Sequence, residues 1–290
     1  MYSGEDLILD IRLNQNYKFV DYFVIIESKF KHNGEIKTKK FNLDKFEKFK
    51  NKIKYFFIED LPGDLKLIDP TDNLKSQNNR KRDNALIREN FQRNMIVKGL
   101  IEANDEDFIL IGDIDEIPNL KNLNLTLHKK NIVIFKQLMF YYKFNLNYKD
   151  FTWHGTKGCT KKNLKSPQWL RNIKNKKYNI FRFDILFSQS KYNNIKFIDS
   201  GGWHFSNIMD AESLFQKLKT FLHHVDFEES NLSVDDIKMK IKDNLIFYNH
   251  GANSSNDDKW SFKKKLHKID NTYLPNYIKN NLSKFSNWIE

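Results

Sequence analysis

Three carboxylates follow one short apolar run near the middle of the chain. The run covers residues 108–111, Gly112 comes next, and Asp113, Asp115 and Glu116 then fall within four residues. Such a run favours a buried strand, and desolvated carboxylates this close together repel one another unless a cation pairs with them. An Asp-x-Asp pair places two oxygen ligands on one side of a turn, which suits Mg²⁺ or Mn²⁺. The pattern predicts a metal site; the alternative is a solvated acidic turn that caps a strand.

The segments around this turn are predicted to alternate between strands and helices. Apolar runs predict strands at residues 20–27, 53–58, 131–142, 178–187 and 195–198. Helical spacing predicts helices at residues 7–13, 43–50, 84–103 and 211–225. Because this alternation is typical of α/β folds, we expect one mixed sheet flanked by helices in a domain of residues 1–210. Residues 211–290 are expected to form a helical carboxyl-terminal extension packed on the same domain.

Two connecting segments are candidates for ligand contact. The polar segment that ends near Arg82 is long enough to predict a mobile loop or lid. Residues 153–160 contain two glycines and predict a loop whose backbone amides approach a phosphate.

Composition restricts the class of protein. The formal charge of +12 favours an anionic partner, but the lysines are spread along the chain. Cys159 is the single cysteine, so neither a disulfide framework nor a thiolate metal site is expected. Apolar runs of transmembrane length and a signal-peptide pattern are missing, which predicts a soluble, cytoplasmic protein.

Six motifs in the same order resemble glycosyltransferase family 17, the family of the β-1,4-mannosyl-glycoprotein β-1,4-N-acetylglucosaminyltransferases. They are residues 6–13, 20–28, 89–94, 107–118, 158–160 and 201–206. The resemblance implies a GT-A-type Rossmann-like sheet and an inverting transfer of a sugar, N-acetylglucosamine from UDP-N-acetylglucosamine, onto a glycan hydroxyl. The sequence departs from the family pattern in two ways. It lacks the Tyr-Asp-containing first strand, and it lacks a Golgi-type membrane anchor.

The resemblance also implies roles for the acidic residues. Asp115 would bind Mn²⁺ or Mg²⁺ directly, and Asp113 would act at the ribose or through water. His204 follows a predicted strand and a Gly-Gly turn and is the candidate for a further metal ligand; a lone histidine is otherwise an ordinary core or surface residue. Glu27 ends a predicted strand and could bind the uridine or the ribose, with a loop cap as its simpler role.

Cationic side chains are needed to neutralise the leaving nucleoside diphosphate. Arg93 lies on the helix before the acidic turn and could pair with the donor or with the turn itself. Lys157 and Arg171 are the other candidates, although a lysine in so basic a chain is more often solvated.

Inversion requires a general base that deprotonates the acceptor hydroxyl. Glu212 is the first candidate and Glu116 the second, but Glu116 could orient the metal ligands and Glu212 could complement a helix amino terminus. Trp153 and Trp203 are candidates to stack on the acceptor sugar, with burial in the core as the alternative.

Three other functions compete with this interpretation. A phosphohydrolase of the haloacid-dehalogenase type also starts from Asp-x-Asp, but it needs a later acidic pair after a glycine. A basic nucleic-acid-binding module needs cations clustered with exposed aromatics, and Arg80, Lys81 and Arg82 form only a short run. A degenerate transferase would bind sugar nucleotide without turnover, which the intact acidic turn disfavours. We therefore expect no nucleic-acid partner.

Overall fold

A computed structural model describes residues 1–179, 181–185, 187–246, 248–249, 260 and 263–290 of the chain. Its α-helices are α1 (Asp6–Asn16), α2 (Leu74–Asn94), α3 (Pro167–Asn172), α4 (Ala211–Leu218), α5 (His224–Glu229), α6 (Val234–Lys242) and α7 (Asn276–Lys279). Its strands are β1 (Phe23–Ser28), β2 (Ile53–Ile58), β3 (Phe108–Ile111), β4 (Glu116–Pro118), β5 (Ile132–Tyr141), β6 (Leu146–Thr160), β7 (Ile195–Ile198), β8 (Gly202–Ser206), β9 (Leu245–Ile246), β10 (Lys264–Lys265) and β11 (His267–Lys268). Short 3₁₀ helices cover Leu43–Lys52, Met95–Leu100, Leu125–His128, Lys161–Asn163, Phe183–Ile185, Asn271–Tyr273 and Ser286–Trp288.

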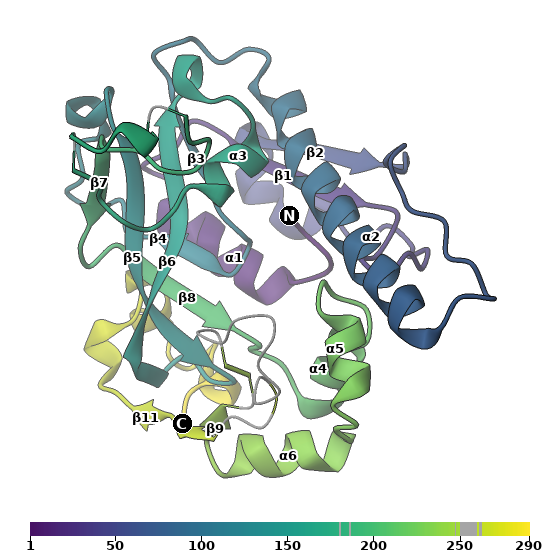
Figure 1. Ribbon diagram of the computed structural model, residues 1–290. Helices are drawn as coiled ribbons and strands as arrows, with labels where there is room; N and C mark the ends of the chain where they lie inside the picture. Colours follow the sequence, from purple (N-terminus) through teal and green to yellow (C-terminus); the bar gives the residue numbers. More distant parts are fainter. Residues whose placement is uncertain (180, 186, 247, 250–259, 261–262) are drawn as a thin grey trace.

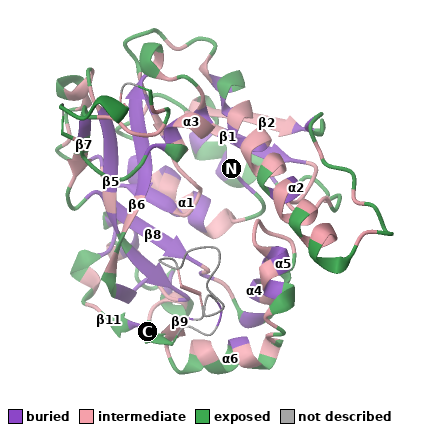
Figure 2. Cartoon of the chain, in the orientation of Figure 1, coloured by how far each residue is buried: buried purple, intermediate pink, exposed green. Residues whose placement is uncertain are grey.

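A curled, mixed sheet of seven strands forms the body of the protein. Its main path runs β11-β6-β5-β8-β4, with β3 added to β6 and β7 added to β5. β5 and β6 are long antiparallel neighbours that run down the left part of the view, and both are largely buried (Figures 1 and 2). β8 lies parallel to β5 and antiparallel to β4, so Glu116 stands opposite His204 in the strand register.

β1 and β2 form a separate parallel pair. Among the described residues, β1 pairs only with β2, and β3 pairs only with β6. A cavity of about 950 Å³ separates the two units, and its walls include Val24 and Ile25 of β1 and Ile109 and Ile111 of β3. The predicted α/β class is confirmed, and the predicted strand at residues 108–111 is β3, which pairs with β6 beside the main path of the sheet.

Two helical segments join the two units. One side of α1 packs Ile8 and Ile11 against the large sheet. Its other side packs Leu9 and Leu13 against β1 and the 3₁₀ helix that precedes β2. Ile96, in the 3₁₀ helix after α2, belongs to a core that contains residues of both units. Side-chain packing therefore joins the units where strand hydrogen bonds do not.

The carboxyl-terminal part mixes helices with short strands. α4, α5 and α6 lie below α2, and α4 packs against α6 (Figure 1). β11 returns to the large sheet and pairs with β6. The division at residue 210 stays a prediction, and residues 247, 250–259 and 261–262 of the expected extension lie outside the described ones. Among the described residues, no helix has the length and apolar character needed to cross a membrane.

Three predicted elements differ in the structure. Leu74–Asn94 is one helix, so the polar segment is helical from Leu74 onward; Asn73 caps it by accepting from the backbone N–H of Ser76. The predicted glycine-bearing loop is part of the strand β6, where Gly158 stands opposite Leu110 and Val133. The predicted strand at 178–187 is not formed by its described residues, which include a 3₁₀ turn; Ile180 and Leu186 lie outside the described part.

Replacement of Gly99 by alanine tests how tightly the 3₁₀ helix after α2 packs on β1. A Cβ at Gly99 would lie 2.5 Å from both Cγ atoms of Val24. We expect Gly99→Ala to lower the free energy of unfolding by roughly 1–3 kcal/mol, because overpacking forces the backbone or the valine to shift. Gly63→Ala is the matched control, since a Cβ there meets nothing within 4 Å. Urea unfolding followed by circular dichroism measures both; equal stabilities would contradict the close approach.

Candidate active site

The acidic turn joins β3 to β4, the strand that ends the main path of the seven-stranded sheet. Gly112 ends β3, and a Cβ at this position would lie 2.7 Å from Thr156 Oγ1 and 2.9 Å from Glu116 Oε2. A glycine is therefore needed for the Glu116 carboxylate to fold back beneath the turn. The backbone N–H of Asp113 donates to this carboxylate at 3.2 Å.

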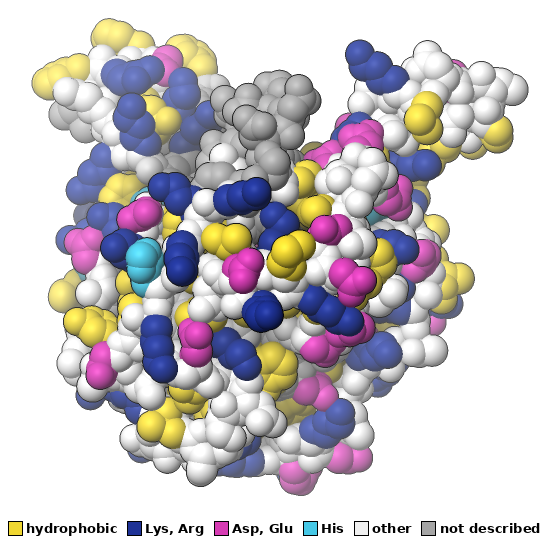
Figure 3. Space-filling view, turned by 90° about the horizontal axis from the view of Figure 1, so that it is seen from below, with side chains coloured by type: hydrophobic (Ala, Val, Ile, Leu, Met, Phe, Trp, Pro, Cys, Tyr) yellow, Lys and Arg dark blue, Asp and Glu magenta, His cyan; other side chains and the backbone are white. Residues whose placement is uncertain are grey.

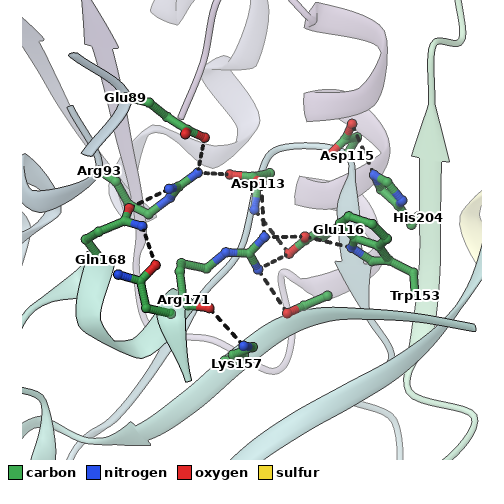
Figure 4. A network of polar contacts seen from close by, with 12 residues as sticks. Glu89, Arg93, Asp113, Asp115, Glu116, Trp153, Lys157, Gln168, Arg171 and His204 are labelled. Carbon is green, nitrogen blue, oxygen red and sulfur yellow. Dashed lines mark hydrogen bonds and ion pairs between the residues drawn. The ribbon is translucent and has the colours of Figure 1, made fainter. Parts of the chain in front are cut away.

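Arg171, on α3, is the main counter-charge of the turn (Figure 4). Its two terminal nitrogens lie 2.9 and 2.8 Å from the two oxygens of Glu116, and one of them also lies 3.1 Å from Asp113 Oδ2. The Glu116 side chain is fully buried. Burial alone would raise the pKa of Asp113, but Arg171 and Arg93 outweigh it and hold that pKa well below its usual range. Asp113 is thus ionised, and the guanidinium of Arg171 holds Glu116 in a fork-shaped ion pair.

Arg93 approaches Asp113 from the opposite side, as Figure 4 shows. Its guanidinium lies 3.1 Å from Asp113 Oδ1, 2.7 Å from Glu89 and 2.5 Å from the amide oxygen of Gln168. Of the two functional partners predicted for Arg93, the acidic turn is the one that it contacts in this structure. Asp113 therefore lies between two guanidinium groups.

A third arginine holds the backbone of the turn. Arg12, on α1, donates to the carbonyl oxygens of Asp113 at 2.6 Å and of Glu116 at 2.8 Å. These two hydrogen bonds join the first and last residues of the turn and place a positive charge beside its backbone. They also explain why α1, which is remote in sequence, packs beside β4.

Asp115 differs from its neighbours because its described polar contact is with an imidazole. Its Oδ2 lies 3.4 Å from His204 Nε2. Burial would raise the pKa of Asp115, but His204 and the nearby Lys217 lower it below its usual value. Asp115 is the carboxylate of the turn that no arginine neutralises among the described contacts.

Trp153, on β6, covers the histidine. Its ring lies 4.5 Å from that of His204 in a stacked arrangement, and its indole N–H donates to Glu116 Oε1 at 2.8 Å. The side chain is partly buried, so it borders the site without being enclosed in the core. Trp153 therefore links the paired part of the turn, at Glu116, with the Asp115–His204 part.

Lys157 supports the site from within. The side chain is buried, and its Nζ donates to the carbonyl of Arg171 at 2.9 Å and to the carbonyl of Ile173. Burial lowers the pKa of Lys157 to about 7. In this arrangement the lysine positions the end of α3, and with it Arg171; a contact of Lys157 with a diphosphate stays a prediction.

Glu27 and Trp203 are predicted site residues that contact other parts of the structure. The buried Glu27 carboxylate accepts from the backbone N–H groups of Lys40 and Phe41 and from the Tyr55 hydroxyl. The indole N–H of Trp203 donates to the carbonyl of Tyr273 at 2.6 Å, and the ring is packed in the core between the large sheet and α1. These contacts match the simpler roles considered for the two residues, a loop cap and a core residue.

Glu212 lies at the start of α4, facing α6. It is 61% exposed and forms an ion pair of 2.7 Å with Lys238. Lys217, five residues further along the same helix, is the α4 residue whose charge acts on Asp115. Glu116, the other predicted base, has both oxygens engaged by Arg171. The structure therefore leaves the assignment of the base a prediction.

Four residues of the site were not among the predicted ones: Arg12, Glu89, Gln168 and Lys217. Glu89 stands four residues before Arg93 on α2, a spacing that places both on one helix face. That signal is present in the sequence. Gln168 and Lys217 carry no such signal, because only the packing of α3 and α4 brings them near the turn.

A divalent cation fits one part of this site. Asp113 and Glu116 are already paired with arginines, whereas Asp115 Oδ2 and His204 Nε2 converge, and His204 Nδ1 is buried without a described hydrogen-bond partner. Among the described residues, no group of three or more His, Cys, Asp or Glu side chains forms a ready metal site. A two-residue site suits Mg²⁺ or Mn²⁺, which take their other ligands from water and substrate phosphates.

An acidic turn with three arginines and an acid–imidazole pair at the edge of an α/β sheet is an arrangement typical of enzymes that handle charged substrates. The family model described as glycosyltransferase family 17 matches residues 1–288, so the chain belongs to this family. It is therefore a glycosyltransferase, an enzyme with a sugar donor and a glycan acceptor. A search of the curated proteins and a search of the solved structures each gave no match.

Replacement of Arg171 measures the strength of its ion pairs. We expect Arg171→Met to lower the free energy of unfolding by about 3–5 kcal/mol, because the buried Glu116 loses its counter-charge. Arg182→Met is the matched control: its partner Asp184 is exposed, so losing this ion pair should change stability little. Urea unfolding gives both values. A loss for Arg171→Met no larger than for the control would show that Glu116 does not depend on Arg171.

The low pKa of Lys157 gives a pH signature. Between about pH 7 and the ordinary lysine value of about 10.4, the unfolded chain binds a proton that the folded chain does not. Stability contributed through Lys157 therefore rises with pH over this range. We expect the destabilisation caused by Lys157→Met to be larger near pH 9.5 than near pH 7 in urea unfolding. Lys98→Met, at an exposed position, is the control; parallel pH profiles for the two variants would contradict the prediction.

Proposed function

We propose that the chain is a metal-dependent, inverting glycosyltransferase that moves N-acetylglucosamine from UDP-N-acetylglucosamine onto a glycan hydroxyl. The observation that carries this proposal is the division of the acidic turn into a part paired with arginine and a part paired with histidine. Asp113 and Glu116 meet Arg171, whereas Asp115 meets His204. A turn that only capped a strand would need no such division. The named sugar and nucleotide rest on the family resemblance.

Asp115 and His204 are the residues that would hold the metal ion. When bound, Mn²⁺ or Mg²⁺ would supply positive charge to the diphosphate of the donor. Arg93 and Arg171 hold Asp113 ionised and fixed at the mouth of the same turn. Asp113 is then placed to accept hydrogen bonds from the donor, directly or through water.

The acceptor hydroxyl must give up its proton to a base in an inverting reaction. Glu116 fits this role less well than Glu212, because Glu116 is buried and both of its oxygens already accept hydrogen bonds. Glu212 is open to solvent and has one described ion pair, with Lys238. Trp153, at the border of the site, is the aromatic residue placed to contact the acceptor sugar.

On the face displayed in Figure 3, the charges do not form the basic surface that a non-enzymatic nucleic-acid-binding module needs. Figure 3 shows Lys and Arg side chains interspersed with Asp and Glu over the displayed face, without one continuous basic band. Nucleic-acid-binding modules typically concentrate their cations along one groove or helix face.

The decisive experiment screens nucleotide sugars with purified protein and Mn²⁺, measuring donor hydrolysis and transfer to glycan acceptors. We expect release of UDP from UDP-N-acetylglucosamine that stops when the metal is chelated. Asp115→Asn should reduce this activity roughly 100-fold or more, since a preorganised charged group is lost from the site. Asp199→Asn is the control, because Asp199 is exposed and pairs with Lys136.

Three outcomes would contradict parts of the proposal. Full activity after chelation would remove the metal, and unchanged metal-dependent UDP binding by Asp115→Asn in calorimetry would remove Asp115 as a ligand. Turnover of another nucleotide sugar alone would replace the donor.

A further inference from the structure

The connection between α3 and β7 exposes an unusual set of aromatic side chains. Phe181, Phe183 and Phe187 are 79%, 80% and 90% exposed, and the value of Phe187 is the highest of any large hydrophobic residue that the structure describes. They lie within seven residues of one another. Phenylalanine in water is unfavourable, and clustered exposed apolar side chains mark interaction surfaces.

Cationic residues surround these aromatics. Lys174, Lys176 and Lys177 are exposed, and among the described residues none of them forms an ion pair. Arg182 and Lys191 share the one carboxylate of the segment, Asp184. The segment therefore carries a surplus of positive charge beside its exposed phenylalanines.

The segment is tied at its base. The backbone N–H of Lys174 donates to the carbonyl of Ser190 at 2.8 Å, so the two ends are held together and the described residues between them project. Figure 1 places the segment beside β7, on the opposite side of the sheet from α2, and Figure 2 shows exposed residues gathered there. It begins directly after α3, the helix that carries Arg171 into the active site.

We propose that residues 174–191 form a peripheral contact with an anionic lipid bilayer. The three phenylalanines enter the interfacial region of the bilayer, where aromatic side chains are favoured. The three unpaired lysines attract the anionic headgroups around them. A bilayer fits better than single-stranded nucleic acid, because nucleic acid stacks its bases in a basic groove, and these phenylalanines stand on a projection.

The proposed membrane contact does not depend on the family membership of the protein, but it has a consequence for a transferase. α3 connects the projection with the acidic turn through Arg171. A bilayer bound at residues 174–191 therefore holds the active site at a fixed height above the lipid surface. Acceptors attached to lipid headgroups would be concentrated there, whereas free glycans would not.

The test is co-sedimentation with vesicles, comparing phosphatidylcholine alone with a mixture of phosphatidylcholine and phosphatidylglycerol. We expect binding to the anionic vesicles only, weakened by added salt because the lysine contribution is screened. The triple variant Phe181→Ser, Phe183→Ser, Phe187→Ser should bind the anionic vesicles with an affinity lower by about tenfold or more. The matched control is Leu67→Ser, Ile101→Ser, Leu127→Ser, three similarly exposed residues elsewhere on the surface, which should bind like the original protein.

Folding of each variant is checked by its thermal transition, and the exposed positions are not expected to alter it. The proposal is overturned if the original protein binds neither kind of vesicle, or if the phenylalanine variant binds as well as the control. It is also overturned if the segment's phenylalanines are needed for binding a labelled single-stranded oligonucleotide but not the vesicles. None of these readouts uses sugar transfer, so failure here leaves the transferase assignment standing, and failure of the assignment leaves this contact standing.

Discussion

The ion pairs of Arg171 with Asp113 and Glu116 are the interaction on which the active site depends. Glu116 is fully buried, and a buried carboxylate of this kind is tolerated only with a hydrogen-bonded counter-charge. Arg171 supplies that charge through two nitrogens, and Lys157 fixes the end of the helix from which Arg171 projects. Asp113 and Glu116 are thus paired with arginine, whereas the described ion pair of Asp115 is with His204.

The large sheet and its flanking helices make this division possible. α1, α2 and α3 each bring one arginine to the turn, and β8 brings His204 opposite Glu116. The three helices and β8 are far apart in sequence, and only β3 and β4, which enclose the turn, are close to each other. The site is thus a product of tertiary packing, although its central motif is local.

The sequence predicted the local parts of this arrangement well. The apolar run, Gly112 and the clustered acids gave the strand and the turn, and the six ordered motifs gave the family that the whole-chain match confirms. It could not predict which way side chains face. Gly155 and Gly158 suggested a loop, yet a Cβ at either would collide with side chains of neighbouring strands, so both are packing glycines within β6. Glu27 and Trp203 stand in motifs of the family but point into the interior, and burial of this kind is set by contacts distant in sequence.

At the cavity between β1 and β3, side-chain packing takes the place of strand hydrogen bonds between the two units. Backbone hydrogen bonds resist sliding more strongly than apolar side-chain contacts do, and across this cavity the described strands share none. α1 and the 3₁₀ helix after α2 both pack on the two units, and Ile26 and Ile58 share a core with Ile109 and Ile111. These same segments adjoin Arg12 and Arg93, which grip the acidic turn. A shift of the smaller unit relative to the large sheet would therefore act first on the two arginines that contact the acidic turn.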